Sequence, residues 1–182
     1  PTMPGQHAAD STTTDDTTDK QPVLLITGGK ITVNADGDGL DSNGNLRVEG
    51  GDITINGPAN GGNGAIDIGT ENGGAGVIAG GTLIALGTSS MTENFGSTST
   101  QCAFLVTMNS FGAGETITIT DSQGTVLYTG VTVKSANSVV FSSADLVVGE
   151  TYTVTIGSTS ATVTQSSTVV GSTNGFGGFG RH

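Results

Sequence analysis

Three Gly-Gly pairs, each flanked by alternating apolar and polar residues, constrain this chain more than any other feature. The pairs begin at Gly28, Gly50 and Gly80, which are 22 and 30 residues apart, and a Gly- and Asn-rich insertion accounts for the longer interval. The apolar residues beside each pair recur at every second position, which is the period of β-strands. A glycine pair permits a tight corner, because glycine adopts a positive φ without steric cost.

Aligning the repeats on these pairs predicts which side chains stack on one another. Each repeat covers its neighbour, as in a solenoid, so residues 22–98 are predicted to form a short parallel β-helix of about three coils. In the same alignment Asn34 lies over Asn56 as a possible amide ladder, and Lys30 lies over Asp52 as an ion pair. Three apolar sets are expected to point inward: Ile26, Val48 and Ile78; Ile31, Ile53 and Leu83; and Val33, Ile55 and Ala85.

The spacing of apolar residues changes after residue 98, where short apolar runs recur about every ten residues with turn residues between them. This spacing predicts a small antiparallel β-sandwich over residues 99–170, and hence an all-β chain. The expected strands are residues 102–108, 115–120, 125–128, 138–141, 151–156 and 160–164. Residues 1–21 form a Thr- and Asp-rich extended tail or linker, and residues 171–182 a Gly-rich tail.

Composition limits the partners of the chain. Its net charge is −11 with five Lys and Arg in 182 residues, whereas a nucleic-acid binder needs clustered basic residues, so no nucleic-acid partner is expected. No apolar run reaches the roughly 18 residues of a membrane span. Low Lys with abundant Gly, Thr and Asn is typical of a secreted or cell-surface bacterial protein. Cys102, the single cysteine, lies in an apolar run and is expected to be a small buried hydrophobe.

An acidic, Gly-rich segment follows the first repeat and supplies the candidate metal ligands. Spaced carboxylate and amide oxygens of this kind suit Ca²⁺, which takes about six to eight oxygen ligands. Two interpretations stay open: these residues only form tight turns, or they form turns and also hold Ca²⁺. The candidate ligands are Asp36, Asp38, Asp41 and Asn43, with Asn63 and Asp67 stacked on them from the next repeat.

The sequence predicts no enzyme. His7 and His182 lie in the two tails, so no His-based triad is supported. The acidic pairs lie in turns without an aromatic platform for a sugar, which argues against a glycoside hydrolase. The remaining polar side chains of the repeats are candidate ligand-binding residues: Lys30, Arg47, Asn34 and Asn56.

The motifs at residues 26–34, 37–44, 57–67, 78–85, 117–121 and 149–154 carry a family resemblance. Over roughly residues 25–170 the chain resembles the C-terminal part of the bacterial secreted carbohydrate-binding-domain β-helix proteins of clostridia and their relatives. The resemblance implies a right-handed parallel β-helix with bound Ca²⁺, and affinity for acidic polysaccharide of the pectin or polygalacturonate type without cleavage. The chain departs from the family in carrying only the last coils.

Two functions from different classes follow. The first is a non-catalytic extracellular carbohydrate-binding protein in which Ca²⁺ bridges to an acidic polysaccharide. The alternative is a structural subunit of an extracellular fibre or surface layer, assembled by strand addition at exposed edges into filaments.

Overall fold

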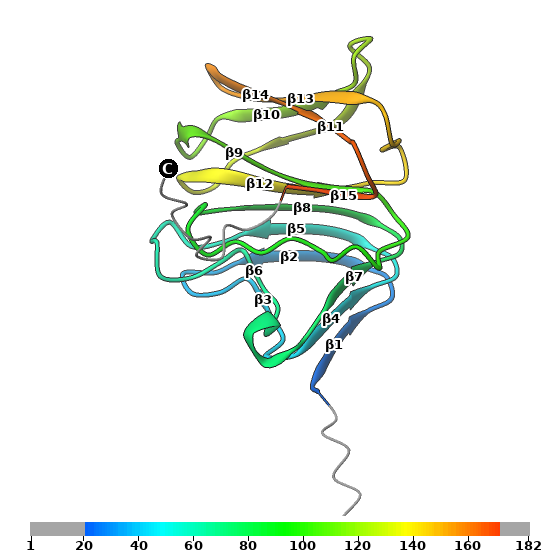
Figure 1. The fold of residues 1–182 in the computed structure, drawn as a ribbon. Helices are drawn as coiled ribbons and strands as arrows, with labels where there is room; N and C mark the ends of the chain where they lie inside the picture. The colour runs from blue at the N-terminus through cyan, green and yellow to red at the C-terminus, as the bar shows by residue number, and fades with distance from the viewer. Residues whose placement is uncertain (1–20, 172–182) are drawn as a thin grey trace, which may run out of the picture.

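A computed structural model describes residues 21–171. The predicted tails at 1–21 and 171–182, with His7 and His182, lie outside these residues except for Gln21 and Gly171. The described chain is all-β, as predicted, with one short 3₁₀ helix, η1 (Thr70–Asn72) (Figure 1). No helix within residues 21–171 is long and apolar enough to cross a membrane.

The three repeats form parallel ladders, so that each strand of one repeat pairs with the equivalent strand of the next. The first ladder is β1 (Val23–Ile26), β4 (Asn45–Val48) and β7 (Gly76–Ile78). The second is β2 (Lys30–Asn34), β5 (Asp52–Asn56) and β8 (Thr82–Gly87), and the third is β3 (Leu40–Asp41) with β6 (Ile66–Asp67). The three inward sets predicted from the sequence are confirmed residue by residue, as are Asn34 opposite Asn56 and Lys30 opposite Asp52.

The Gly-Gly pairs form the corners between the first and second ladders. The second glycine of each pair has a positive φ, at +91° for Gly29, +113° for Gly51 and +89° for Gly81. At Gly81 a Cβ atom would also lie 2.6 Å from the Gly51 carbonyl oxygen, because the corners stack closely. The corner therefore needs glycine both for its dihedral angle and for the approach of the next repeat.

The remaining strands extend the second ladder and cover it. β9 (Ala103–Phe111), β12 (Ala136–Ser142) and β15 (Val169–Val170) complete a six-stranded sheet of order β15-β9-β12-β8-β5-β2. β10 (Thr116–Thr120), β11 (Val126–Val131), β13 (Thr151–Ile156) and β14 (Thr159–Thr164) form an antiparallel sheet of order β11-β10-β13-β14. Because β8 pairs antiparallel with β12, one sheet runs from the repeats into the second half of the chain.

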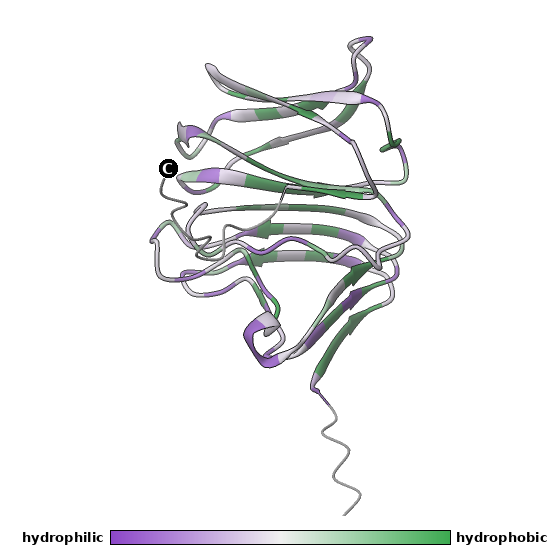
Figure 2. Cartoon of the chain, in the orientation of Figure 1, coloured by the Kyte–Doolittle hydropathy of each residue, from purple (hydrophilic) through white to green (hydrophobic). Residues whose placement is uncertain are grey.

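The six-stranded sheet separates two hydrophobic cores, and Figure 2 shows hydrophobic segments along its strands. One core fills the space inside the repeats, and Val140 of β12 contributes to it. The other lies between the six-stranded sheet and the antiparallel sheet, where the Phe104 ring lies 5.7 Å from Phe141 and 6.3 Å from Tyr152, measured between centroids. Alternate residues of the shared sheet point into opposite cores, so neither half buries its apolar surface without the other.

The stacked repeats have one covered end and one open end. At the third repeat, the connection after β8 hydrogen-bonds to the ladders: the Glu93 amide donates to Ile66 O at 3.1 Å and the Gly96 amide to Gly76 O at 2.7 Å. β8 itself is covered by β12. At the first repeat, no strand within residues 21–171 pairs with the outer edges of β1, β2 and β3.

Candidate functional site

The candidate site is the outer surface of the β3–β6 ladder, which we call the acidic face. Asp41 and Asp67 lie opposite each other in register, while their neighbours Leu40 and Ile66 point inward and are buried. Side chains alternate across a strand, so the two carboxylates share the outer surface. The predicted proximity of Asp41 and Asp67 is confirmed, and parallel pairing holds their Cα atoms about one strand spacing apart, roughly 4.8 Å.

Partial burial and nearby negative charge both act on Asp67 of this face. Its pKa is raised above the ordinary value of 3.8, chiefly because partial burial removes water from the carboxylate. The carboxylates of Asp38, Glu93, Asp41 and Glu71 raise the Asp67 pKa further, in that order. The folded chain therefore holds Asp67 in a position where its charged form is disfavoured, unless a cation lies nearby.

Two members of the acidic face were not among the predicted ligands. Glu93 accepts hydrogen bonds from the Ile68 amide and from the Thr70 hydroxyl, and its own amide donates to Ile66 O. The segment after the third repeat thus lies along β6, in the position where a third strand of that ladder would run. Glu71 is exposed on η1, four residues after Asp67. Its nearness in sequence was an available signal, whereas nothing in the sequence places Glu93.

Asp38 and Asp41 also stabilise the turns of this face. Asp38 Oδ1 accepts from the Gly64 amide at 2.7 Å, which ties the first repeat to the second. Asp41 Oδ1 accepts from the Asn43 amide at 3.2 Å, and Asn43 has a left-handed φ of +43°. Asn63 donates to Asn60 Oδ1 at 3.2 Å in one amide orientation, and to Asp38 Oδ2 at 3.2 Å in the other. The turn role expected of these residues is therefore present.

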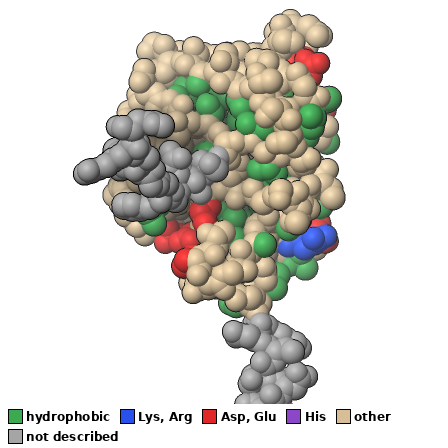
Figure 3. Space-filling model, in the orientation of Figure 1, with side chains coloured by type: hydrophobic (Ala, Val, Ile, Leu, Met, Phe, Trp, Pro, Cys, Tyr) green, Lys and Arg blue, Asp and Glu red, His purple; other side chains and the backbone are tan. Residues whose placement is uncertain are grey.

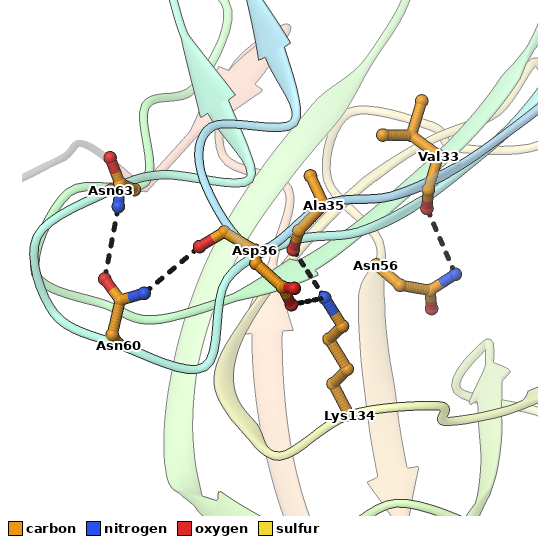
Figure 4. A network of polar contacts seen from close by, with 7 residues as sticks. All are labelled: Val33, Ala35, Asp36, Asn56, Asn60, Asn63 and Lys134. Carbon is orange, nitrogen blue, oxygen red and sulfur yellow. Dashed lines mark hydrogen bonds and ion pairs between the residues drawn. The ribbon is translucent and has the colours of Figure 1, made fainter.

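Asp36 lies apart from the other predicted ligands. Its Oδ1 atom lies 2.7 Å from Lys134 Nζ, and this ammonium also donates to Ala35 O at 2.6 Å (Figure 4). The hydrogen bond and charge of Lys134 lower the pKa of Asp36. Asp36 is thus neutralised from within the chain, and it is not one of the groups that raise the pKa of Asp67.

No basic side chain of the described chain compensates the acidic face. Residues 21–171 contain only Lys30, Arg47 and Lys134 as Lys or Arg. Each forms an ion pair elsewhere: Lys30 with Asp52 at 3.5 Å, Arg47 with Glu49 at 2.6 Å, and Lys134 with Asp36 at 2.7 Å. Figure 3 shows acidic side chains gathered over β3 and β6. Within residues 21–171, therefore, no Lys or Arg forms an ion pair with Asp67 or with the four carboxylates that raise its pKa.

The predicted ligand-binding side chains do not converge on this face. Lys30 and Asn34 are exposed on β2, at the open end of the repeats, and Arg47 lies on the outer surface of β4. The Asn56 side chain is buried, and its amide group donates a hydrogen bond to Val33 O at 3.3 Å. This bond to the first repeat reaches a backbone carbonyl and not the side-chain amide of Asn34, which the expected amide ladder would require.

The acidic face has the donor chemistry of a hard cation but not a closed cage. Among residues 21–171, no three side chains of His, Cys, Asp and Glu converge as a metal-binding group. Asp41 and Asp67 supply carboxylates on neighbouring strands, and Asp38 and Glu93 adjoin them. Such a set fits an ion that takes part of its oxygen shell from the protein and the rest from water or a ligand.

Comparisons of the chain with protein-family models, with curated proteins and with solved structures find no match.

Proposed function

We propose that the protein is a non-catalytic extracellular carbohydrate-binding module that holds Ca²⁺ on its acidic face and, through that ion, an acidic polysaccharide of the pectin type. The observation that carries the proposal is the in-register pair Asp41 and Asp67, which lacks a basic partner in residues 21–171; three further carboxylates help to raise the pKa of Asp67.

Charge explains why a metal ion belongs in this proposal. An acidic protein and a polyuronate repel each other, so a direct contact between them would be unfavourable. Ca²⁺ prefers carboxylate oxygens and takes about six to eight of them in a flexible geometry. Asp41 and Asp67 would leave most of these positions for uronate carboxylates and water to fill, and the ion then attracts both partners.

The shape of the face supports a polymer rather than a small molecule. We infer that the parallel ladders are coils of a short right-handed parallel β-helix, whose stacked strands present a ridge of outward side chains. Asp41 and Asp67 lie exposed or half-buried on this ridge. An extended glycan chain can lie along such a surface, and the family resemblance of residues 25–170 supports the secreted location and the class of glycan.

Calorimetric titration tests the proposal. The metal-free chain would be titrated with Ca²⁺ and then with polygalacturonate. We expect heat from both ligands, the second only after the first. Heat from Ca²⁺ alone would make the ion structural, and polygalacturonate binding that persists in a chelator would remove the bridging role.

A matched pair of variants locates the site. Asp41→Asn with Asp67→Asn removes two charges from the acidic face and should abolish both heats. The control, Asp52→Asn with Glu49→Gln, removes two charges from carboxylates that pair with Lys30 and Arg47 elsewhere, and should leave both heats unchanged. Equal losses in the two double variants would show that only net charge matters.

A structural subunit of an extracellular fibre or surface layer is the second candidate. The outer edges of β1, β2 and β3 pair with no strand of residues 21–171, which favours this candidate, since such edges are templates for strand addition. Electron microscopy of dilute protein tests it: a fibre subunit would give filaments, and uniformly dispersed small particles would count against this candidate.

A further inference from the structure

The open end of the stacked repeats exposes apolar side chains that the second repeat buries. Leu24, Ile31 and Val33 of the first repeat are half-buried. Their in-register neighbours in the second repeat, Leu46, Ile53 and Ile55, are at most 1% exposed. The hydrophobic core of the repeats therefore reaches this surface without a covering layer from residues 21–171.

The outer backbone edge of β2 likewise pairs with no strand of residues 21–171. The Ala35 amide donates to Asn56 O, and Gly29 O accepts from the Asp52 amide, so odd-numbered residues of this strand face β5. In a parallel ladder a residue directs both its N–H and its C=O to the same neighbour, and successive residues alternate. Thr32, like Lys30 and Asn34, thus directs its N–H and C=O to the free edge.

Two other occupants of this edge fit the chain poorly. Moving back by one 22-residue repeat from Leu24, Ile26, Ile31 and Val33 gives Thr2, Pro4, Ala9 and Ser11, which lack the large apolar side chains of a repeat. Head-to-tail stacking of copies would need the opposite end of the repeats, which the segment after β8 and strand β12 already cover. Two copies of this chain can therefore meet at this edge only by placing one open end against the other.

We propose that β2 is a dimer interface, at which β2 of a second copy pairs antiparallel with it about a two-fold axis at Thr32. This register places Thr32 opposite Thr32 of the second copy, and Lys30 opposite Asn34. All three residues direct their backbone groups to the edge, so they form the hydrogen-bonded pairs that an antiparallel ladder requires. A contact of this kind is self-complementary and closes at two copies.

Side chains agree with the same register. Ile31 lies opposite Val33 of the second copy, on the inner side, so each copy extends the other's core across the interface. These are non-hydrogen-bonded pairs, in which side chains approach most closely. An edge lysine often prevents pairing. Here Lys30 is paired with Asp52 and meets a neutral Asn34, so no like charges face each other.

Analytical sedimentation of the 182-residue chain in a chelator tests the proposal independently of Ca²⁺ and glycan. The salt concentration would be about 0.15 M, at which surface charges are screened beyond roughly 8 Å. We expect a concentration-dependent dimer. Thr32→Pro removes the edge-facing N–H, which donates to no strand of residues 21–171, and should abolish the dimer. Thr32→Ala keeps that N–H and should preserve it. A chain that stays monomeric at all concentrations, with the Thr32 amide protected from hydrogen exchange, would show that residues 1–20 cover the edge and would overturn the proposal.

A charge pair tests the register itself and does not depend on the folding of the proline variant. Asn34→Glu places a carboxylate opposite Lys30 of the second copy, twice per dimer, and should tighten dimerisation by roughly 2- to 30-fold. Asn34→Lys places like charges there and should weaken it by a similar factor. Circular dichroism would verify that both variants fold. A dimer that is insensitive to Thr32→Pro, or that responds to both Asn34 variants with the same sign, uses another surface and overturns the proposal.

Discussion

Lys134 and Asp36 lie 98 residues apart in the sequence, yet Lys134 Nζ lies 2.7 Å from Asp36 Oδ1. The loop between β11 and β12 thereby holds the turn between β2 and β3. Because β3 carries Asp41, the second half of the chain helps to set the position of the acidic face.

The first prediction concerns this link. Lys134→Met removes both the ion pair and the hydrogen bond to Ala35 O, whereas Asp36→Asn removes only the charge of the pair. We expect Lys134→Met to lower the melting temperature more than Asp36→Asn does, and to speed hydrogen exchange of amides near residue 36. The Asp36 pKa is lowered, so the stabilisation by the ion pair is present above pH 3.8 and is lost as the pH falls through the folded pKa. Equal effects of the two variants at neutral pH would show that the bond to Ala35 contributes nothing.

The second prediction concerns Asp67. Its pKa is raised, so the native state binds more protons than the unfolded state, and stability decreases as the pH rises from 3.8 through the folded pKa. Asp67→Asn removes this penalty. We expect the variant to unfold at a higher denaturant concentration than the wild type at pH 7 in a chelator, and the difference to vanish below pH 3.8. Adding Ca²⁺ should raise the stability of the wild type more than that of the variant, and the reverse order would contradict the proposed ion.

The third prediction compares a leucine inside the repeats with the one stacked on it at the open end. Leu46 is 1% exposed, whereas its register partner Leu24 is half-buried. Leu46→Ala should cost about 2–5 kcal/mol of unfolding free energy, since it leaves a cavity. Leu24→Ala should cost roughly half as much, since part of its surface is already in water. Urea denaturation measures both, and a larger loss at Leu24 would mean that another layer covers the open end.

The fourth prediction compares two corners with similar dihedral angles. Gly29 and Gly81 both have φ near +90°, but a Cβ at Gly29 meets nothing within 4 Å, whereas one at Gly81 lies 2.6 Å from Gly51 O. Gly29→Ala should cost about 1–2 kcal/mol for the left-handed backbone alone. Gly81→Ala should cost clearly more, since the stacked corners must also move apart. Thermal unfolding of the two variants measures the difference, and equal losses would indicate that the corners separate freely.

Local periodicity explains why much of the repeat architecture was predictable. Strand pairs such as Ile53 with Leu83 follow from aligning the Gly-Gly pairs, because a parallel stack keeps equivalent residues in register. The positive φ of Gly51 follows from the corner that the pair must form. Asp41 opposite Asp67 does not follow from the 22-residue offset, which would place Asp41 over Asn63; it follows from matching the acidic, Gly-rich segments of the first two repeats.

Contacts that do not follow from the repeat pattern were not predictable from the sequence. The sequence alone did not indicate that β8 pairs antiparallel with β12. This pairing joins the repeats and the second half of the chain in one sheet, although the spacing of apolar residues differs before and after residue 98. The sequence also did not place Glu93 beside Asp67, nor did it distinguish Asp36 from the other acidic residues of its turn. These arrangements depend on which apolar faces cover each other after the chain has turned back.

The sequence by itself determined the strand type, the corners, the register of the repeats and the acidic character of the β3–β6 surface, since each depends on residues at a regular short spacing. Tertiary structure decided which carboxylates have no basic partner, and which end of the repeats has no covering strand, within residues 21–171. Lys134 neutralises Asp36 and leaves Asp67 uncompensated, and the segment after β8 covers one end while the edge of β2 stays unpaired within residues 21–171. The physical reason is that ion pairs and edge coverage depend on distances between segments far apart in the chain, which folding of the whole molecule sets.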